Sequence, residues 1–494
     1  MRFLAPLILL SWWLAWKFQD PYISDWDGFD YTASVVRGLP SPLGLGRALF
    51  IGYNHLLWKL LHHLHLLRQE DAYLILRYGS ILLSGPAVAG IYALTNELTQ
   101  RRLAAFFAGI LMATSPFFIT YSGRSMSEIP GIFLLSWSLW GLVHSLKLRK
   151  IPLVLISAAL IGLSANVREI AIFYLPFIPF AIYLTGMTGL TGLMGHRWRL
   201  GVTALAIAGL TALSGMLFWI MQRGFLYWNE VATWYRLSAQ ERRLHPVTIQ
   251  NFSLFSDYAY DCSVAVVILV PLVFALLWPR KKLRPLLILG MLGLLADIVM
   301  LINHDLSVNP RYLLTGMIGL VPVCGWGLAD IYDRSPWRAL VLTCGLAVLS
   351  LANFVQISPQ YYWQARNAAA TAAYLERIRD FPWNSGFIVG ARSPLINFYA
   401  AIEAQPSWKT ISPGAGWPDD KLDEAIDDLL LAGRVVYVDF DPELWQHGAR
   451  ASSREANGLR LIRERYCLRP VVGELFQIIE RADRPNLCPP SHNQ

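Results

Sequence analysis

Three aspartates stand together just after the first apolar segment of the chain. They are Asp25, Asp27 and Asp30, in the stretch SDWDGFDY at residues 24–31, which follows the apolar residues 3–18. Charged side chains beside a membrane are costly, and they persist mostly where they are paired, hydrated or functional. A carboxylate at such a place can accept a proton from a hydroxyl group. The stretch is therefore either a site for a polar substrate or a solvated loop.

Three later polar breaks between apolar segments bring arginines and one more acid. The first holds Arg124 and Glu128, the second Arg168 and the third Arg311. If the chain turns helically at the first break, Arg124 and Glu128 share a face, and a local salt bridge is the alternative interpretation. Guanidinium groups bind phosphate in a fixed two-point geometry. With the aspartates, they favour a transfer reaction with a phosphate leaving group, and a lipid-linked phospho-sugar fits such a site.

The elements that must hold these residues are predicted to be membrane-spanning helices. The chain has 494 residues, of which 55% are hydrophobic and only 15% are charged, so it is too apolar for a soluble protein of this length. About eleven apolar segments approach the roughly 20 residues that cross a bilayer. They are residues 3–18, 72–96, 103–121, 129–146, 151–166, 170–187, 200–222, 262–279, 285–303, 312–331 and 338–356. The first is read as a retained anchor, because no small-x-small cleavage site precedes Asp20.

Basic residues in alternate short loops set the expected orientation. The positive-inside rule places these loops in the cytoplasm, together with the N-terminus. The aspartates, the three arginines and everything after Ser358 then face outward across the plasma (inner) membrane. The net charge of +8 reports this topology and not a nucleic-acid partner. The basic loops hold Arg101/Arg102, Lys147/Arg149/Lys150, Arg197/Arg199, Arg280/Lys281/Lys282/Arg284 and Arg334/Arg338.

Two regions outside the spans have their own patterns. Leucines between Leu56 and Leu64 alternate with polar residues and predict an amphipathic helix that lies in the membrane interface. A transmembrane domain, 1–358, is followed by a polar tail, 359–494, which is predicted to be a small extracytoplasmic α/β domain. A disulfide between Cys467 and Cys488 in that tail is an open alternative that requires the tail to lie outside the cytoplasm. The tail has helical periodicity at Ala368–Arg379 and Asp420–Leu431 and strand-like runs at Phe387–Gly390, Val435–Phe440 and Val471–Ile479.

Residues 1–356 resemble the GT-C glycosyltransferases that use polyprenyl-phosphate sugars, such as protein O-mannosyltransferases and lipid A aminoarabinose transferases. The resemblance rests on the acidic motif DWDGFDY at residues 25–31 and on the Tyr-x-x-Arg-x-x-x-Glu-x-Pro pattern from Tyr121 to Pro130. It also rests on Arg168 after a short span and on Arg311-Tyr312 at the start of a late one. Many members have Asp-Glu in the first loop where this chain has Asp27-Gly28. The second acid is then either absent or supplied by Asp25 or Asp30.

The resemblance implies a multi-pass α-helical fold and an inverting hexosyl- or pentosyltransferase. Asp27, with Asp25, would orient and deprotonate an acceptor hydroxyl, and Glu128 would assist. Arg124, Arg168 and Arg311 would bind the donor phosphate and stabilise its developing charge. Aromatic residues at the same rim are candidates for contact with the sugar or the acceptor, and anchoring in the interface is the alternative for each. These are Trp26, Tyr31, Tyr121, Trp228 and Tyr312.

The partners that follow are a polyprenyl-phosphate sugar, membrane lipids and a glycan, lipid or protein acceptor. No cofactor is predicted, no Cys/His spacing resembles a zinc site, and a requirement for a divalent metal stays an open alternative. Two other functions also remain. A transporter or flippase for a lipid-linked glycan would place its substrate residues near the bilayer midplane and show internal repeats, which this sequence does not. A non-catalytic cell-envelope assembly factor with a decayed site is the third, because Gly28 leaves one acid missing.

Overall fold

The computed structural model describes eleven stretches of the chain and a few single residues, among them Trp228. Asp25, most of the long loop after Gly224, the predicted span 262–279, most of the predicted span 338–356 and Cys488 lie outside the described residues. The stretches are 3–23, 26–38, 47–184, 194–224, 280–303, 310–335, 369–389, 393–402, 408–411, 419–440 and 448–481.

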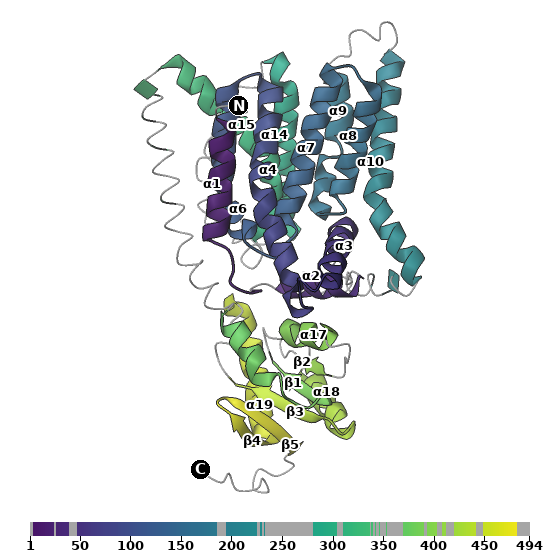
Figure 1. Ribbon diagram of the computed structural model, residues 1–494, viewed down its shortest axis with the longest axis vertical. Coiled ribbons are helices and arrows are strands. Elements are labelled where there is room, and N and C mark those ends of the chain that lie inside the picture. Colours follow the sequence, from purple (N-terminus) through teal and green to yellow (C-terminus); the bar gives the residue numbers. More distant parts are fainter. Residues whose placement is uncertain are drawn as a thin grey trace.

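The first part of the chain is a bundle of helices that run side by side, and a mixed α/β region lies beyond one end of it (Figure 1). Buried apolar side chains from most bundle helices form one large core. The elements are α1 (Leu4–Lys17), α2 (Trp26–Arg37), α3 (Ala48–His63), η2 (Glu70–Ala72), α4 (Tyr73–Thr99), α5 (Arg102–Ala113), α6 (Pro116–Ser122), α7 (Glu128–Lys147), α8 (Ile151–Ser164), η3 (Glu169–Tyr174), α9 (Phe177–Leu184), α10 (Met194–Arg223), η4 (Lys281–Leu283), α14 (Arg284–Asn303), η5 (Pro310–Tyr312) and α15 (Leu313–Arg334).

Within the described residues, four helices are long and apolar enough to cross a membrane, or five if one bent pair is counted as a span. The four include α4, α7 and α15, which match predicted spans. The predicted span 103–121 is instead bent by 64° between α5 and α6. Ser115, just before Pro116, is extended (ψ 129°), because the proline ring disfavours helical geometry in the residue before it. The figure of eleven spans remains a prediction.

Close contact between α14 and α15 fixes the end of the bundle from which Arg311 extends. Small residues let membrane helices approach until their backbones touch. A Cβ atom on Gly319 of α15 would collide with the backbone carbonyl of Leu289 in α14. Beside this contact the hydroxyl of Tyr174 donates a hydrogen bond to the Thr315 carbonyl at 2.7 Å. The start of α15 is thus held rigidly against its neighbours.

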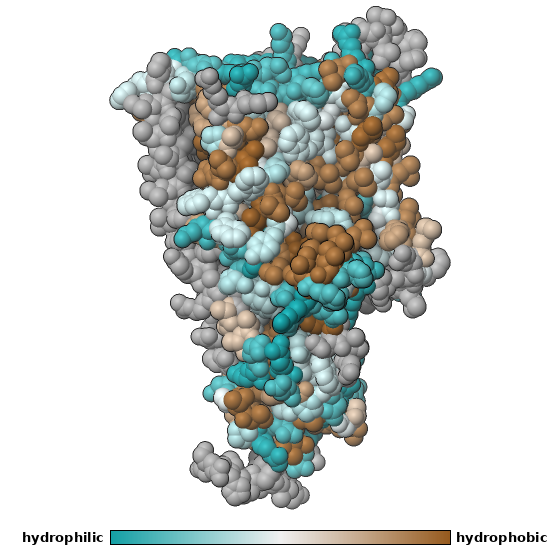
Figure 2. All heavy atoms as spheres, in the orientation of Figure 1, coloured by the Kyte–Doolittle hydropathy of each residue, from teal (hydrophilic) through white to brown (hydrophobic). Residues whose placement is uncertain are grey.

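Helix α3 lies at the same end of the bundle and presents leucines to its surroundings. Phe50, Ile51 and Trp58 on its other side are buried in the bundle core. Figure 2 shows an apolar surface at the level of α3. The predicted helix is present with exposed leucines on one side and a buried inner side, and its position in the membrane interface remains a prediction. The exposed leucines are Leu49, Leu56, Leu57, Leu60 and Leu64.

The C-terminal region, 369–481, contains a five-stranded sheet in the order β2-β1-β3-β5-β4. Strands β1, β2 and β3 are parallel, and β4 and β5 form an antiparallel hairpin that joins β3. The predicted strands at 387 and 435 and both predicted helices are present, and Cys467 is disulfide-bonded. The predicted strand Val471–Ile479 is wrong, because the chain turns at Gly473 (φ 57°) and the range holds the end of β4 and most of β5. The elements are β1 (Ser385–Ile388), α17 (Ser393–Ile402), β2 (Lys409–Ile411), α18 (Asp419–Leu431), β3 (Val435–Asp439), α19 (Gly448–Arg465), β4 (Tyr466–Val472) and β5 (Leu475–Arg481).

Candidate active site

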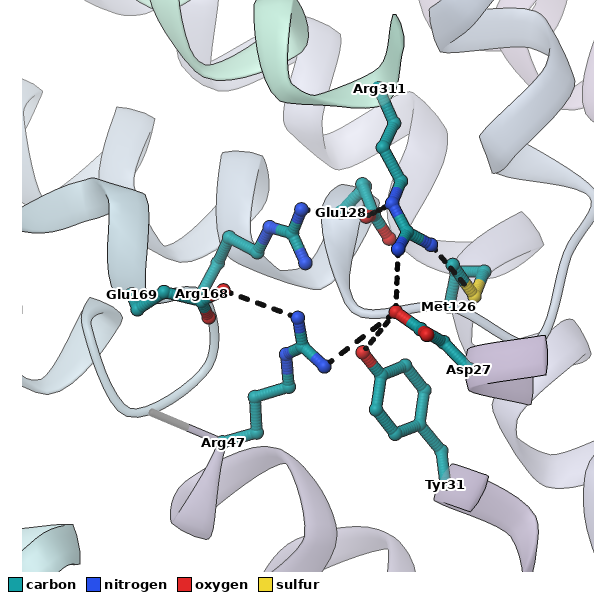
Figure 3. A network of polar contacts seen from close by, with 8 residues as sticks. All are labelled: Asp27, Tyr31, Arg47, Met126, Glu128, Arg168, Glu169 and Arg311. Atoms are coloured by element: carbon teal, nitrogen blue, oxygen red, sulfur yellow. Dashed lines mark hydrogen bonds and ion pairs between the residues drawn. The ribbon is translucent and has the colours of Figure 1, made fainter. Parts of the chain in front are cut away.

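Asp27 lies at the centre of a polar network at the end of the bundle that faces the C-terminal region. Its Oδ2 accepts a hydrogen bond from Nη2 of Arg311 at 2.6 Å and another from the Tyr31 hydroxyl at 3.1 Å. Nη1 of Arg47 is 3.9 Å from the same oxygen. Figure 3 shows the guanidinium groups converging on this carboxylate. Segments nearly 300 positions apart in sequence therefore meet at one oxygen atom.

Glu128 extends the network to a third arginine. Its Oε1 is 3.0 Å from Nη2 of Arg168 and 3.6 Å from Nε of Arg311. Glu128 and Arg168 are almost fully buried, with side chains only 2% and 3% exposed. Neither carboxylate oxygen of Glu128 and neither terminal nitrogen of Arg168 makes a hydrogen bond to a described residue. The pair attracts by charge but leaves its hydrogen-bonding capacity unused.

Arg47 is a member of the network that the sequence analysis did not identify. It pairs with Glu169 at 3.2 Å as well as with Asp27, and its side chain is 4% exposed. The backbone carbonyl of Asn166 accepts hydrogen bonds from the first N–H groups of α3, those of Leu49 and Phe50. Because the first four N–H groups of a helix lack partners within it, such a contact fixes the helix end. It brings Arg47 next to the Arg168 turn.

The remaining network residues sit at the ends of helices, where the sequence sets their direction. Glu128 is the first residue of α7, where a negative charge is favoured by the helix dipole. Arg311 lies in η5, directly after Pro310 and before α15. Arg168 is extended and opens η3, and its N–H bonds back to the Ser164 carbonyl at 2.9 Å. The chain thus delivers each charge from a helix terminus, as the sequence pattern predicted.

Electrostatics keep Asp27 ionised in the resting protein. Burial alone would raise the pKa of this carboxyl group. The guanidinium groups of Arg311, Arg47 and Arg168 outweigh burial and hold the pKa of Asp27 below its usual range. Asp27 is therefore a weak proton acceptor while it is paired with Arg311.

Tyrosine rings support the guanidinium groups. Arg47 lies over the ring of Tyr31 at 4.7 Å, and Arg168 lies over Tyr312 at 5.0 Å. Arg311 lies over the Tyr312 ring as well, at 5.6 Å. A cation above an aromatic face is stabilised without using its N–H donors. Tyr31 and Tyr312 were predicted to contact the sugar or the acceptor, and in this structure their rings contact the arginines.

Other predicted site residues have different contacts. Arg124 makes an ion pair with Asp20 at 3.4 Å and lies over the ring of Tyr121. The expected pairing of Arg124 with Glu128 on one helical face is wrong, because α7 begins only at Glu128. Trp228 is exposed, and Asp25 and the side chain of Trp26 lie outside the described residues.

Three comparisons relate this arrangement to known proteins. Residues 60–219 match the family model described as dolichyl-phosphate-mannose-protein mannosyltransferase. The crystal structure of ArnT from Cupriavidus metallidurans in the apo state aligns with a TM-score of 0.59 at 10% identity, over 96% of each chain. The chain has the GT-C fold. A search of curated proteins finds no match.

Two further structures support this GT-C assignment. ArnT from Cupriavidus metallidurans bound to undecaprenyl phosphate aligns at 11% identity over 96% of this chain and 97% of that one, with a TM-score of 0.59. The Archaeoglobus fulgidus oligosaccharyltransferase, tethered with an acceptor peptide containing the NVT sequon, aligns at 12% identity over 96% and 74%, with a TM-score of 0.54. The resemblance predicted from the sequence is confirmed. Together the family match and the GT-C fold support a membrane glycosyltransferase that uses a lipid-linked donor.

The structure also explains the glycine at the second position of the first-loop motif. A Cβ atom on Gly28 would come 2.9 Å from Cγ2 of Ile23 and 3.6 Å from the Ser125 carbonyl oxygen. A side chain of any size would push α2 away from these neighbours. Gly28 therefore sits in a close packing contact.

A metal site was left open by the sequence. In the part of the chain that the structure describes, no three His, Cys, Asp or Glu side chains gather as metal ligands. The carboxylates near Asp27 instead face arginines, which compensate their charge. The carboxylates of this network are thus paired with guanidinium groups among the described residues.

Proposed function

We propose that this protein is an inverting membrane glycosyltransferase that transfers a sugar from a polyprenyl-phosphate donor to an acceptor hydroxyl. Asp27 is the general base, and Arg311, Arg168 and Arg47 bind the donor phosphate. The family match and the GT-C fold support the class of reaction. The assignment of the residues rests on the geometry of the network.

The observation that carries the proposal is the unused hydrogen-bonding capacity of Arg168. Its two terminal nitrogens are buried, and they make no hydrogen bond to a described residue. A buried donor without an acceptor costs about 1–3 kcal/mol. A phosphate oxygen between Arg168 and Arg311 would accept from both, since guanidinium matches phosphate in a planar two-point geometry. The site is built to be completed by an anion.

Donor binding would change which partner each arginine holds. Phosphate negative charge draws Arg311 from Asp27, so that the pKa of Asp27 rises toward its ordinary value. Asp27 then accepts the acceptor's hydroxyl proton while the acceptor oxygen forms a bond to the anomeric carbon. The bond from that carbon to the phosphate oxygen breaks on the opposite face, and its electron pair leaves with polyprenyl phosphate. Arg168 and Arg311 stabilise the charge that develops on the leaving group.

Glu128 has a supporting role in this scheme. It is buried between Arg168 and Arg311 and reaches both with one oxygen. Because it contacts both guanidinium groups, we assign it the orientation of the arginines. Asp25 remains the alternative base.

The site is proposed to face away from the cytoplasm. Helix α4 runs from Tyr73, near the site, to Glu97 at the far end of the bundle, where Lys147 pairs with it at 3.0 Å. Arg101 and Arg280 gather around Asp330 at that same far end. By the positive-inside rule these basic loops are cytoplasmic, and the disulfide at Cys467 suits an oxidising compartment. Cysteines introduced into the C-terminal region should react with an impermeant reagent in intact cells, and labelling only after lysis would overturn this orientation.

The test is transfer by the purified protein in a lipid bilayer. A panel of polyprenyl-phosphate sugars is supplied with candidate glycan, lipid and protein acceptors, and release of polyprenyl phosphate is measured. Arg168→Gln should raise the donor KM and lower kcat by about 10²–10³, the usual loss for one group that stabilises a developing negative charge. Arg101→Gln, the same substitution at the far end of the bundle, is the matched control. Equal kinetics of Arg168→Gln and the wild type would refute the phosphate site.

A further inference from the structure

The C-terminal region packs directly on α2, the helix that carries Asp27. Helix α17 contacts α2, and the rings of Phe398 and Phe29 are 5.8 Å apart. Phe29 is 5% exposed and belongs to the same hydrophobic core as the sheet residue Phe387. Figure 1 shows α17 on the side of the C-terminal region that faces the bundle, below α2. One residue of the site helix is therefore part of the core of another region.

Helix α2 has two buried faces because of this packing. Asp27, Tyr31 and Val35 repeat every four residues, and Tyr31 and Val35 are fully buried in the bundle core. Phe29 and Ala33 repeat in the same way and pack in the C-terminal core. Residues two apart on a helix point about 200° from each other. The side of α2 that presents Asp27 to Arg311 is therefore backed by the side that the C-terminal region covers.

Contacts on either side of α2 reinforce the same interface. Ile23, just before α2, is 2% exposed and lies in the C-terminal core. The ring of Tyr22 is 5.1 Å from that of Tyr73 at the start of α4. Arg379 of the C-terminal region pairs with Glu70 at 3.3 Å. Ile23 is also the residue that a Cβ atom on Gly28 would meet at 2.9 Å, so this residue of the C-terminal core lies close to the backbone of α2.

We infer that the C-terminal region is a positioning element of the active site, which holds α2 against the bundle through Phe398 so that Asp27 faces Arg311. The inference rests on the proposed function for its catalytic part. Helix α2 has 12 residues, and an isolated helix of about that length is marginal in water, so packing must stabilise it. Removing one of its two packed faces will let Asp27 move relative to Arg311. A displacement of about 1 Å at a reacting group can cost about 10²-fold in rate.

The experiment compares three variants of the full-length protein in bilayers. Phe398→Ala removes the ring on α17, and Phe398→Leu retains apolar volume there. Phe476→Ala is the matched control, since Phe476 lies on β5 and its ring is 5.5 Å from that of Phe440, the residue after β3. Hydrogen exchange of the α2 amides reports docking without any need for activity. Kinetics with the polyprenyl-phosphate sugar report positioning.

Phe398→Ala should speed exchange in α2 and leave α4 and α7 unchanged. It should lower kcat by about 10- to 100-fold and change the donor KM less, because Arg168 and Glu128 are held by the bundle. Phe398→Leu should recover most of the activity, and Phe476→Ala should retain wild-type kcat per folded molecule. The double variant Phe29→Ala/Phe398→Ala should have the same kcat as the less active of the two single variants, because both substitutions remove the same contact.

Unchanged α2 exchange in Phe398→Ala would overturn the docking. Faster exchange with unchanged kcat would overturn the positioning role, as would an equal loss of kcat in Phe476→Ala. A wild-type protein that transfers no sugar but shows the expected exchange pattern would refute the proposed function and still support the docking of α2. The two claims therefore fail in distinguishable ways.

Discussion

Replacing Asp27 by asparagine separates the two roles that the structure gives this residue. Asparagine keeps the size of the side chain and an oxygen that can accept the Tyr31 hydroxyl bond. Arg311 retains Glu128 at 3.6 Å, and Arg47 retains Glu169 at 3.2 Å. No guanidinium loses its last carboxylate, so the cost in folding free energy should be about 1–3 kcal/mol. Leaving a buried charge without a partner would cost about 3–5 kcal/mol.

Asp27→Asn should slow turnover and at the same time strengthen donor binding. Loss of the base should lower kcat by about 10²–10⁴, which corresponds to about 3–5 kcal/mol of activation free energy. The donor phosphate no longer competes with the Asp27 carboxylate for Arg311. We therefore expect the variant to bind the donor about tenfold more tightly, which corresponds to about 1.4 kcal/mol.

The assay combines equilibrium binding of the polyprenyl-phosphate sugar with release of polyprenyl phosphate in the presence of acceptor. Asp30→Asn, on the same helix, is the control and should keep nearly full activity. Wild-type turnover in folded Asp27→Asn would remove Asp27 as the base and move attention to Asp25. Reduced turnover together with weaker donor binding would refute the exchange of partners at Arg311.

Three further changes test other parts of the site. Arg311→Ala should weaken donor binding and slow transfer, and Arg311→Lys should recover only part, because an ammonium group lacks the planar fork; donor titrations of both variants check this. Because the arginines lower the pKa of Asp27, kcat/KM should stay level as pH falls to about 4 and drop below that value, while in Arg311→Ala the drop should begin at higher pH. The stability from these pairs is likewise present above the unfolded-state pKa of about 3.9 and is lost as pH falls through the lower folded value. Gly28→Ala should lower kcat through the 2.9 Å approach to Ile23, whereas Gly52→Ala, which meets no atom within 4 Å, should leave transfer rates unchanged.

The sequence predicted those site residues whose positions follow from local rules. Glu128, Arg168 and Arg311 stand at polar breaks between apolar runs, so their common depth follows from the length of a membrane helix. Strands β1 and β3 of the C-terminal region were likewise predicted from local runs of apolar residues, whereas the predicted strand Val471–Ile479 is divided by a turn at Gly473. Such patterns depend only on near neighbours in the chain.

Arg47 and the docking on α2 depend on contacts that no local pattern encodes. In the sequence Arg47 is a single arginine in front of an amphipathic helix. Its position depends on the Asn166 carbonyl, more than 100 residues away, which accepts hydrogen bonds from the start of that helix. Phe29 sits inside an acidic motif, where an aromatic residue equally suits an interfacial anchor, and only the folded chain shows Phe398 against it. The expected pairing of Arg124 with Glu128 was wrong for the opposite reason, because a local helical rule was applied before the first residue of α7.

The ion pairs of Figure 3 join three arginines to three carboxylates among the described residues, so these six charges cancel before any substrate arrives. A neutral cluster offers no net attraction to phosphate or nucleotides dissolved in the surrounding water. An anion that enters must exchange one partner for another, and a small soluble anion gains little from that exchange. A lipid phosphate arrives along the bilayer, where its chain confines it to the surface of the bundle and raises its local concentration. Selection among anions at this site would then be made by the hydrocarbon chain, at a distance from the charges that carry out the reaction.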